Sequence, residues 1–346
     1  MNLRKASAAV GILALALGAS ACAVDGGEGS ADGPITIACG AMEDWCQKMT
    51  SEFTAATGIE ASFVRLSSGE TVARLEAAKS APEFDVWHGG PVDGFGAAKN
   101  ADLIEAYASP NREAIPEKYR DPDGFWTGVY VGVLGFCSNQ KVLDKLGLEA
   151  PTSWEALLDP KLSQNVSSAH PSTSGTAFTT LWTQVTRLGG EDEGLAYMAK
   201  LHNNILQYSK SGTAPGQTAG RGEVAVGLVF SHDCVKYKEE GMSDLVVTFP
   251  SEGTGYEIGG VALVKGSKHA EAAKKYIDWT LTAEAQDNGP KVGSYQVLTH
   301  PDAKVDERMV RLADINLVDY DFFAAADAKK ALTARFDEEI ASAPKE

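Results

Sequence analysis

Residues 34–66 have the sequence PITIACGAMEDWCQKMTSEFTAATGIEASFVRL, in which two short apolar segments flank an amphipathic one. Residues 34–39 predict a short buried strand, because β-branched and small apolar residues fill them. Residues 43–56 predict an amphipathic helix that ends at Gly58. Residues 59–66 predict a second strand. We therefore expect this stretch to form a strand–helix–strand unit.

The same alternation continues along the chain. A helix is expected over residues 70–79, where Val72, Leu75 and Ala78 share one face, and a third strand is expected over residues 84–87. This order of elements indicates a parallel sheet with helices on both faces.

A longer apolar segment, residues 126–137, is long enough to leave one domain and enter another. A second α/β block is expected after it, and residues 259–264 are expected to form a returning strand. Residues 268–346 are expected to be mostly helical. The second block is predicted to contain helices near residues 153–158, 175–188 and 191–200, and strands near residues 164–169, 204–208 and 224–231.

The composition is that of an ordinary globular protein, since 44% of the 346 residues are hydrophobic and 23% are charged. The length suits one large or two medium domains. The chain has 31 Lys and Arg residues against 47 Asp and Glu residues, which gives a formal net charge of −16. No nucleic-acid partner is expected, because binding to phosphates of nucleic acid needs basic patches.

The N-terminal residues predict that the protein is exported. Arg4 and Lys5 precede an apolar run over residues 6–19, which is too short to span a bilayer as a stable helix. Residues 1–21 therefore suit a signal peptide.

Small residues before Cys22 resemble a bacterial lipobox, which implies cleavage before Cys22 and lipidation of its thiol. The alternative is an ordinary secretory peptide that is cut nearby. Residues 22–33 are mostly small or polar and are expected to form a flexible tether. The expected location is the outer face of the cell membrane, with the lipid anchor as the only membrane attachment, or the periplasm.

Export also changes what the other four cysteines imply, because an oxidising compartment favours disulfides. Four cysteines allow three pairings. Cys39 ends a predicted strand and Cys46 lies early in the next helix, so a Cys39–Cys46 disulfide is expected, which leaves Cys137–Cys234 as the second. The alternative is four buried free thiols.

Polar loops follow several predicted strands, at the sheet edge where open α/β sheets bind ligands. Two of them, Ser67-Ser68-Gly69 and Ser172-Thr173-Ser174-Gly175-Thr176, each follow a strand and open a helix. Free backbone N–H groups, hydroxyl donors and the positive end of the helix dipole make such a position an anion site. The alternative is that these residues only cap helices. The presence of two such loops favours an anion-binding site, to which Ser211 is added from a third loop.

The pair His232-Asp233, together with Glu257, supplies an imidazole and two carboxylates. These groups suit the hydroxyls of a sugar or an ammonium group, and His88 from another strand end is assigned to the same side of the site. The alternative is a helix-capping Asp beside a surface His.

Enzyme motifs are absent from the chain. It has no Gly-x-Ser-x-Gly elbow, no His-Glu-x-x-His, no P-loop and no Gly-x-Gly-x-x-Gly. No catalytic residue, metal ligand or cofactor is therefore assigned. A secreted hydrolase that uses Asp233 and His232 is the alternative from another class of protein.

Several spaced motifs resemble one family, the extracellular solute-binding proteins of ABC importers of the iron(III) type. They are Phe63–Glu70, Asp85–Gly90, Pro171–Thr176 and Gly253–Gly260, within a resemblance that covers about residues 34–300. The resemblance implies an α/β, two-lobe periplasmic-binding-protein fold of type II. Each lobe would be a mostly parallel sheet flanked by helices, and hinge crossovers would join the lobes.

The resemblance also implies the domain organisation. Lobe 1 is expected to comprise residues 34–131 and 258–298, and lobe 2 residues 132–257, while residues 299–346 form a helical segment that packs on both. Crossovers match residues 126–137 and 256–264. The family closes its lobes over a ligand and delivers it to an ABC permease with its ATPase, and we expect a monomer.

Ferric binders of this family carry a Tyr-Tyr pair nine and ten residues after a Gly-Glu, and a His after the first strand. Counting from Gly222-Glu223 leads to His232-Asp233, and Met42 stands at the other position. Phenolates and imidazole suit a hard ferric ion, so the resemblance to ferric binders does not include their metal ligands.

The motifs also resemble the branch of the family that binds hexose phosphates and related organophosphates. There a His-Asp pair and a later Glu hold the sugar hydroxyls, while Ser and Thr residues at helix starts hold the phosphate. The resemblance implies a small phosphorylated solute such as a sugar phosphate. Ferric iron or a ferric anion and aminoethylphosphonate remain as alternative ligands.

Overall fold

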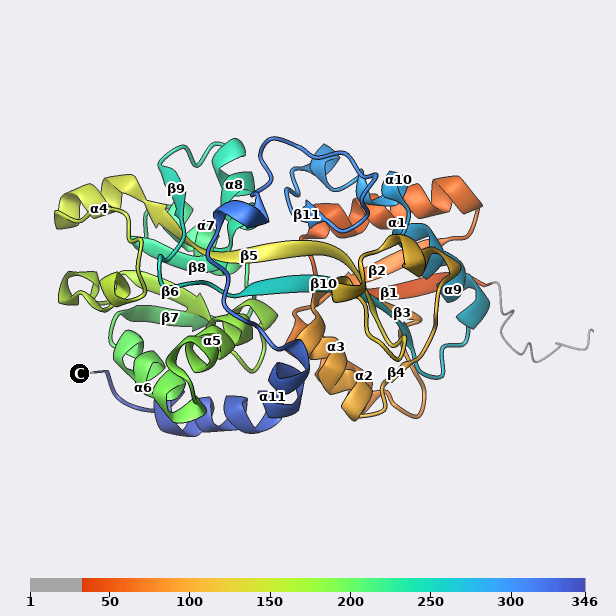
Figure 1. The fold of residues 1–346 in the computed structure, drawn as a ribbon, viewed down its shortest axis with the longest axis horizontal. Helices are drawn as coiled ribbons and strands as arrows, with labels where there is room; N and C mark the ends of the chain where they lie inside the picture. Colours follow the sequence, from red (N-terminus) through yellow and green to blue (C-terminus); the bar gives the residue numbers. More distant parts are fainter. Residues whose placement is uncertain (1–32, 346) are drawn as a thin grey trace, which may run out of the picture.

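The computed structural model describes residues 33–345, which form two lobes lying side by side (Figure 1). The expected signal peptide, the lipidation site Cys22 and the tether up to residue 32 lie outside the described residues.

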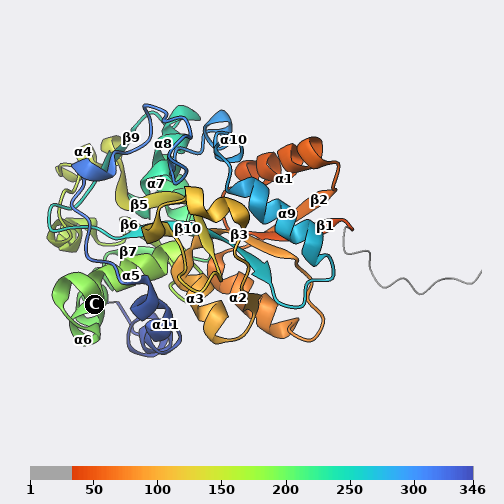
Figure 2. The same cartoon turned by 45° about the vertical axis from the view of Figure 1, so that its right-hand side comes forward.

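Lobe 1 contains the parallel strands that the N-terminal sequence predicts. β1 (Ile35–Cys39) lies between β2 (Ala61–Arg65) and β3 (Val86–Pro91) and runs parallel to both. α1 and α9 cover one face of this sheet, and α2 and α3 cover the other (Figure 2). The remaining elements are α1 (Glu43–Thr57), α2 (Ser68–Ala77), α3 (Val92–Asn100), β4 (Ile104–Glu105), α9 (Ala270–Thr280), α10 (Ala283–Gln286) and β11 (Val297–Leu298).

Lobe 2 repeats this layering around β6 (Val166–Ala169), which pairs in parallel with β7 (Ile205–Ser209) and β8 (Val226–Phe230). The helix expected near residues 153–158 is a short 3₁₀ segment, Glu155–Leu158. The other elements are α4 (Gln140–Leu146), α5 (Gly175–Leu188), α6 (Glu191–His202), α7 (Ala214–Gly220), α8 (Ser231–Glu239) and β9 (Leu245–Thr248).

Two long strands connect the lobes. β5 (Thr127–Asn139) pairs with β10 (Tyr256–Val264) through Val133 and earlier residues, and with β8 from Leu134 onward. One strand thus belongs to both sheets, and the path β2-β1-β3-β10-β5-β8-β6-β7 is continuous. All 13 residues of β5 are buried, which explains why glycine and apolar residues fill most of this segment.

Each lobe has its own hydrophobic core. In lobe 1, Trp87 stacks on Phe95, and Phe53 of α1 meets Tyr276 of α9 edge-on. In lobe 2, the largest core side chains include Trp154, Phe136 and Phe178. Separate cores joined by two strands and a C-terminal segment let each lobe keep its own structure while the lobes move.

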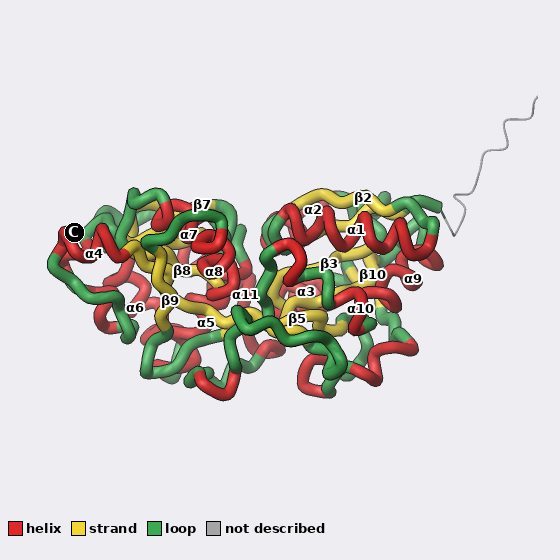
Figure 3. The backbone as a smooth tube through the Cα atoms, turned by 90° about the horizontal axis from the view of Figure 1, so that it is seen from above, coloured by secondary structure: helices red, strands yellow, loops and turns green. Residues whose placement is uncertain are grey.

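The C-terminal region is helical only in part. Residues 299–321 run mostly without regular structure along the side of the molecule that carries β5 (Figure 3). α11 (Phe322–Phe336) then packs against α3 of lobe 1, while its residues Leu332 and Phe336 enter the core of lobe 2. A π-helical turn, Asp337–Ala341, follows it.

Both disulfides expected from the sequence are formed. Cys39–Cys46 joins the end of β1 to α1, with 6.1 Å between the Cα atoms. Cys137–Cys234 joins β5 to α8, with 5.6 Å between the Cα atoms. Within residues 33–345, no helix has both the length and the apolar character needed to cross a membrane.

Candidate ligand-binding site

A cavity lies between the two lobes, where the strand ends of both sheets meet. Its floor comes from the two connecting strands, through Tyr130 of β5 and Glu257 of β10. Its lining comprises Gly40, Ala41, Met42, Arg65, Ser67, Ser68, Gly90, Pro91, Tyr130, Ser174, Gly175, Thr176, Gly212, Thr213, Phe230, His232, Asp233, Glu257 and Gln296.

Lobe 1 contributes the start of α2 to this cavity. Ser67 lies immediately before the helix, where its backbone N–H donates to Glu70 Oε2 at 3.1 Å, and Ser68 is the first helical residue. Both serines are buried and line the cavity. The start of α2 therefore presents the side chains of Ser67 and Ser68 to the space between the lobes, while the Ser67 and Gly69 N–H groups are bound within the protein.

Lobe 2 contributes the start of α5 from the opposite side. Ser174 caps this helix, since its Oγ accepts from the Ala177 N–H at 3.2 Å, and Gly175 and Thr176 form the first turn. A Cβ atom at Gly175 would lie 2.8 Å from Ser68 Oγ, which shows how closely the two helix starts approach each other. Both predicted anion loops thus meet in one cavity.

Three other residues of these loops, Gly69, Ser172 and Thr173, do not line the cavity. The Gly69 N–H donates to the Thr173 carbonyl at 2.9 Å, which is a hydrogen bond between the lobes. A Cβ at Gly69 would lie 2.1 Å from the Ser172 carbonyl oxygen, so only glycine fits this contact. The loop ends of the two lobes are therefore closed on each other beside the cavity.

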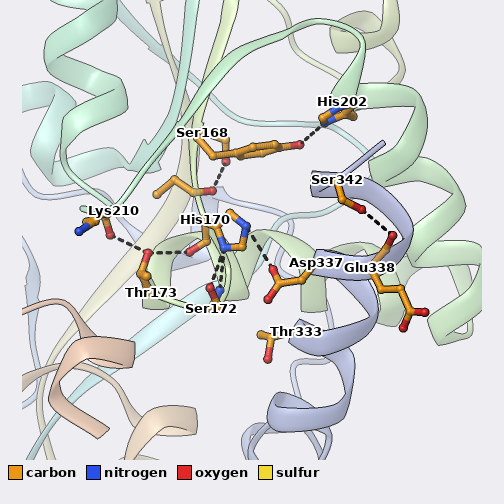
Figure 4. A network of polar contacts seen from close by, with 12 residues as sticks. Ser168, His170, Ser172, Thr173, His202, Lys210, Thr333, Asp337, Glu338 and Ser342 are labelled. Atoms are coloured by element: carbon orange, nitrogen blue, oxygen red, sulfur yellow. Dashed lines mark hydrogen bonds and ion pairs between the residues drawn. The ribbon is translucent and has the colours of Figure 1, made fainter. Parts of the chain in front are cut away.

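A polar network holds the lobe 2 loop from behind (Figure 4). His170 contacts Ser172 Oγ through Nδ1 at 2.7 Å and Asp337 Oδ1 through Nε2 at 3.2 Å. The Thr173 hydroxyl donates to the carbonyls of His170 and Lys210. Ser172 and Thr173 are thus held by the protein itself.

Ser211 and His88 also lie outside the cavity lining. Ser211 lines an open pocket next to the cavity, and its Oγ is 3.0 Å from Thr213 Oγ1. His88 is completely buried, with Nδ1 2.9 Å from the Tyr276 hydroxyl and its ring against Trp45. Burial lowers the pKa of His88 to about 3.

His232, Asp233 and Glu257 line the cavity together, as the sequence predicts. His232 and Asp233 stand on the first turn of α8, directly after β8, and Glu257 is the second residue of β10. His232 Nε2 is 3.5 Å from Asp233 Oδ1, while the buried His232 Nδ1 has no hydrogen-bond partner in the protein. A Cβ at Gly132 would lie 2.7 Å from Glu257 Oε1 and 2.8 Å from His232 Cε1, so β5 needs glycine there.

Burial dominates the electrostatics of this group. It raises the pKa of Asp233 to about 7, against the opposing charges of Arg65 and Lys236. It raises the pKa of Glu257 well above its usual range, and the charges of Asp233 and Asp93 add to this effect. Burial also lowers the pKa of His232 to about 3. Burial thus favours the uncharged forms of all three side chains, which still offer hydrogen-bonding atoms to a ligand.

The cavity also contains residues that are not among those expected from the sequence, such as Arg65 and Tyr130. Arg65 is held by hydrogen bonds from Nε to the Ala41 carbonyl at 3.1 Å and from Nη1 to Ser67 Oγ at 3.3 Å. Tyr130 accepts from the Gly90 N–H at 2.9 Å. Arg65 precedes Ser67 by two residues. Because side chains alternate between the two faces of an extended chain, this spacing places Arg65 and Ser67 on the same side, and it could have indicated that Arg65 lies at the site.

Two lobes joined by crossover strands, with a cavity between them, form the architecture of proteins that bind a small solute between their lobes. The chain belongs to the bacterial extracellular solute-binding proteins, whose family model matches residues 83–326. Among residues 33–345, no group of three or more His, Cys, Asp or Glu side chains is arranged as ligands of a metal ion.

Proteins similar to this chain differ in the solutes that their names give. The periplasmic binding protein AfuA from Actinobacillus pleuropneumoniae, solved with exogenous fructose-6-phosphate bound, is 39% identical with a TM-score of 0.87, over 90% of this chain and 99% of that one. A Salmonella typhimurium protein, named as a candidate 2-aminoethylphosphonate-binding periplasmic protein, is 27% identical over 70% of each chain. Iron-bound HitA from Pseudomonas aeruginosa is 18% identical with a TM-score of 0.75, over 87% of this chain and 98% of that one, a likeness of fold alone.

Proposed function

We propose that this protein is the solute-binding component of an ABC importer and captures a small phosphorylated organic solute, such as a sugar phosphate. The observation that carries the proposal is the meeting of two Ser-rich helix starts, one from each lobe, in a single cavity. Such helix starts bind anions through free N–H groups and the helix dipole. The similarity to a fructose-6-phosphate-bound protein supports the choice of a phosphate.

Within this proposal the cavity has two sides. Ser67, Ser68, Ser174, Gly175 and Thr176 hold the phosphate, while His232, Asp233 and Glu257 hold the hydroxyls of the organic part. The remaining candidates act indirectly: Gly69, Ser172 and Thr173 join the lobes, Ser211 borders the opening, and His88 supports Trp45 beneath the cavity.

Transport uses closure of the two lobes rather than chemistry. Residues 34–131 with 258–298 move against residues 132–257, and the ligand binds preferentially to the closed state. The closed protein then delivers its ligand to the permease and its ATPase. The protein acts as a monomer, exported by residues 1–21 and anchored through a lipid on Cys22.

A second ligand of the same kind is 2-aminoethylphosphonate. It is favoured by the carboxyl groups of Asp233 and Glu257, whose ionised forms a bound ammonium group would stabilise, and by the similar Salmonella protein. Helix starts bind phosphonates and phosphate esters alike, so an experiment must separate the two.

A thermal-shift panel on the purified protein tests the proposal. It compares hexose phosphates, 2-aminoethylphosphonate, inorganic phosphate, neutral hexoses and ferric citrate. A ligand at about 100 times its dissociation constant stabilises the folded state by about 2.7 kcal/mol, which raises Tm by several degrees. We expect stabilisation by phosphorylated solutes and none by neutral hexoses. Stabilisation by ferric citrate alone contradicts the proposal, as does turnover of a phosphate ester.

A further inference from the structure

We propose that Arg65 makes the site selective for a doubly charged anion, so that it favours a phosphate ester over a singly charged ester of the same shape. This inference rests on the proposed function, and it assigns a specificity-determining role to a residue outside the two helix starts and the His232–Asp233–Glu257 group.

Among residues 33–345, Arg65 is the only Lys or Arg side chain in the cavity lining. Its guanidinium is fixed by the Ala41 carbonyl and by Ser67 Oγ, so it lies beside the start of α2. It also borders the neighbouring open pocket, which shares Met42 and Thr213 with the cavity. Arg65 therefore stands where the charged end of a ligand can meet both the serine hydroxyls and a cation.

The charge of Arg65 is not consumed by an ion pair. Across residues 33–345, its hydrogen bonds go to uncharged oxygens, those of Ala41 and Ser67. The guanidinium has five N–H donors, of which these bonds use two, so donors remain for a ligand. A planar guanidinium binds two oxygens of a phosphate at once, which a single positive point charge does not do.

The rest of the cavity lining offers no second positive charge to an anionic ligand. The other ionisable side chains of the lining are Tyr130, His232, Asp233 and Glu257, and none of them supplies a positive charge at neutral pH, because burial keeps His232 unprotonated. Asp233 and Glu257 instead repel an anion wherever they ionise. A dianion gains more from Arg65 than a monoanion does, since the attraction scales with charge.

Lys236 provides a matched control at the same opening. Its Nζ lies 2.5 Å from Asp44 Oδ2, 2.9 Å from Glu240 Oε1 and 2.9 Å from the Val292 carbonyl. Its charge is thus already neutralised, and it joins α8 of lobe 2 to lobe 1. Removing Lys236 weakens closure around any ligand, whereas removing Arg65 changes which ligand is preferred.

The experiment measures dissociation constants by calorimetry at about pH 7.5 for the full exported chain. The probes are glucose 6-phosphate and fructose 6-phosphate, each paired with its 6-sulfate, because a phosphate ester is largely a dianion there and a sulfate ester is a monoanion. The variants are Arg65→Gln, Arg65→Lys and Lys236→Met.

We expect the wild-type protein to bind the phosphate esters more tightly than the sulfate esters. Arg65→Gln should weaken phosphate-ester binding by about 10- to 100-fold and sulfate-ester binding by much less, so the preference shrinks. Arg65→Lys should restore part of the preference. Lys236→Met should weaken both members of a pair by the same factor.

If Arg65→Gln and Arg65→Lys weaken the binding of both esters by the same factor, or weaken the binding of neither ester, the role of Arg65 is overturned. The proposed function still stands in that case. If Arg65→Gln fails to fold, Arg65→Lys decides in the same way, because a purely structural arginine gives no change in the ratio. Failure of the wild-type protein to bind either phosphate ester overturns this inference, and failure to bind any phosphorylated solute of the thermal-shift panel overturns the proposed function as well.

Discussion

Gly132 shows how one missing side chain shapes the site. It lies on β5 beneath Glu257 and His232, and a Cβ there would come within 2.8 Å of both side chains. We expect Gly132→Ala to displace the Glu257 carboxylate and to lower ligand affinity about tenfold or more, because hydrogen bonds in the site need their geometry. Calorimetry with the tightest ligand of the panel measures this loss.

Gly128 is the control for Gly132, since it lies on the same strand and a Cβ there would approach Ile258 Cγ2 and the Tyr119 carbonyl instead. Gly128→Ala should cost about 1–3 kcal/mol of stability by overpacking and leave affinity nearly unchanged. Equal affinity losses in both variants would show that strain in β5, not displacement of Glu257, is the cause.

Asp233 makes the stability of the ligand-free protein depend on pH. Burial raises its pKa from 3.8 to about 7, so between these values the folded protein keeps a proton that the unfolded chain has released. The contribution of Asp233 to the free energy of unfolding is therefore fully present below about pH 4 and is lost as pH rises to 7.

Asp233→Asn removes this titration. Urea unfolding should be measured at about pH 5 and pH 8. As pH rises to 7, the free energy of unfolding of the wild-type protein should fall relative to that of Asp233→Asn, by up to about 1.4 kcal/mol for each pH unit. His232 titrates in both proteins, and Glu76→Gln on the exposed face of α2 serves as the control. A constant difference between wild type and Asp233→Asn would argue that Asp233 is ionised in the folded protein throughout.

A cavity side chain can be predicted from the sequence where neighbouring residues in the chain fix its position. Ser67, Ser174 and His232 lie at the starts of helices that come next after strands, so a local pattern puts them at the sheet edge. Gln296 reaches the cavity from a loop after α10, and its position depends on packing between distant segments. No local pattern marks such a residue.

The second disulfide supports the helix that carries His232 and Asp233. Cys137–Cys234 ties α8 to β5 across 97 residues, whereas Cys39–Cys46 spans 7. A cross-link that closes a longer loop restricts the unfolded chain more. Replacing Cys137 and Cys234 by Ala should therefore lower the free energy of unfolding by about 4 kcal/mol, and replacing Cys39 and Cys46 by Ala should lower it by less. Urea unfolding of the two double variants measures both values. A larger loss for the short loop would show that native packing around Cys46 outweighs the effect on the unfolded chain.

Secondary structure is predictable where one periodic face packs on one sheet. α5 matches the expected residues 175–188 because its apolar face lies on the core of lobe 2. Residues 299–321 depart from the expected helical content for a tertiary reason. Asn316 and Val318 there form backbone hydrogen bonds with Thr254 just before β10, and such long-range pairing leaves no helical period in the sequence.

Contacts between the lobes lie on more than one side of the cavity. Lys236 binds Asp44 at the opening, and Gly69 binds Thr173 beside the helix starts. Behind the cavity, Lys329 of α11 pairs with the buried Asp93 of α3 at 2.7 Å. The charge of Asp93 also contributes to the raised pKa of Glu257. Glu257 in the cavity and the Asp93–Lys329 pair are therefore electrostatically linked.

Gly69 provides the sharpest test of closure. In the closed protein a Cβ at this position would collide with the Ser172 carbonyl oxygen at 2.1 Å, but when the lobes separate that oxygen moves away with lobe 2. Gly69→Ala should therefore disfavour the closed state without unfolding lobe 1, since Gly69 lies in an α-helix where alanine is favoured.

We expect Gly69→Ala to weaken binding of every ligand by a similar factor, about tenfold or more, because a less populated binding-competent state lowers apparent affinity for all ligands alike. Small-angle X-ray scattering should also show a larger radius of gyration than for the wild-type protein at saturating ligand. Glu76→Ala, on the exposed face of the same helix, is the control and should change neither quantity. A compact Gly69→Ala protein with unchanged affinity would mean that the contact between Gly69 and Thr173 is not part of closure, and that the lobes are held together through Lys236 and α11.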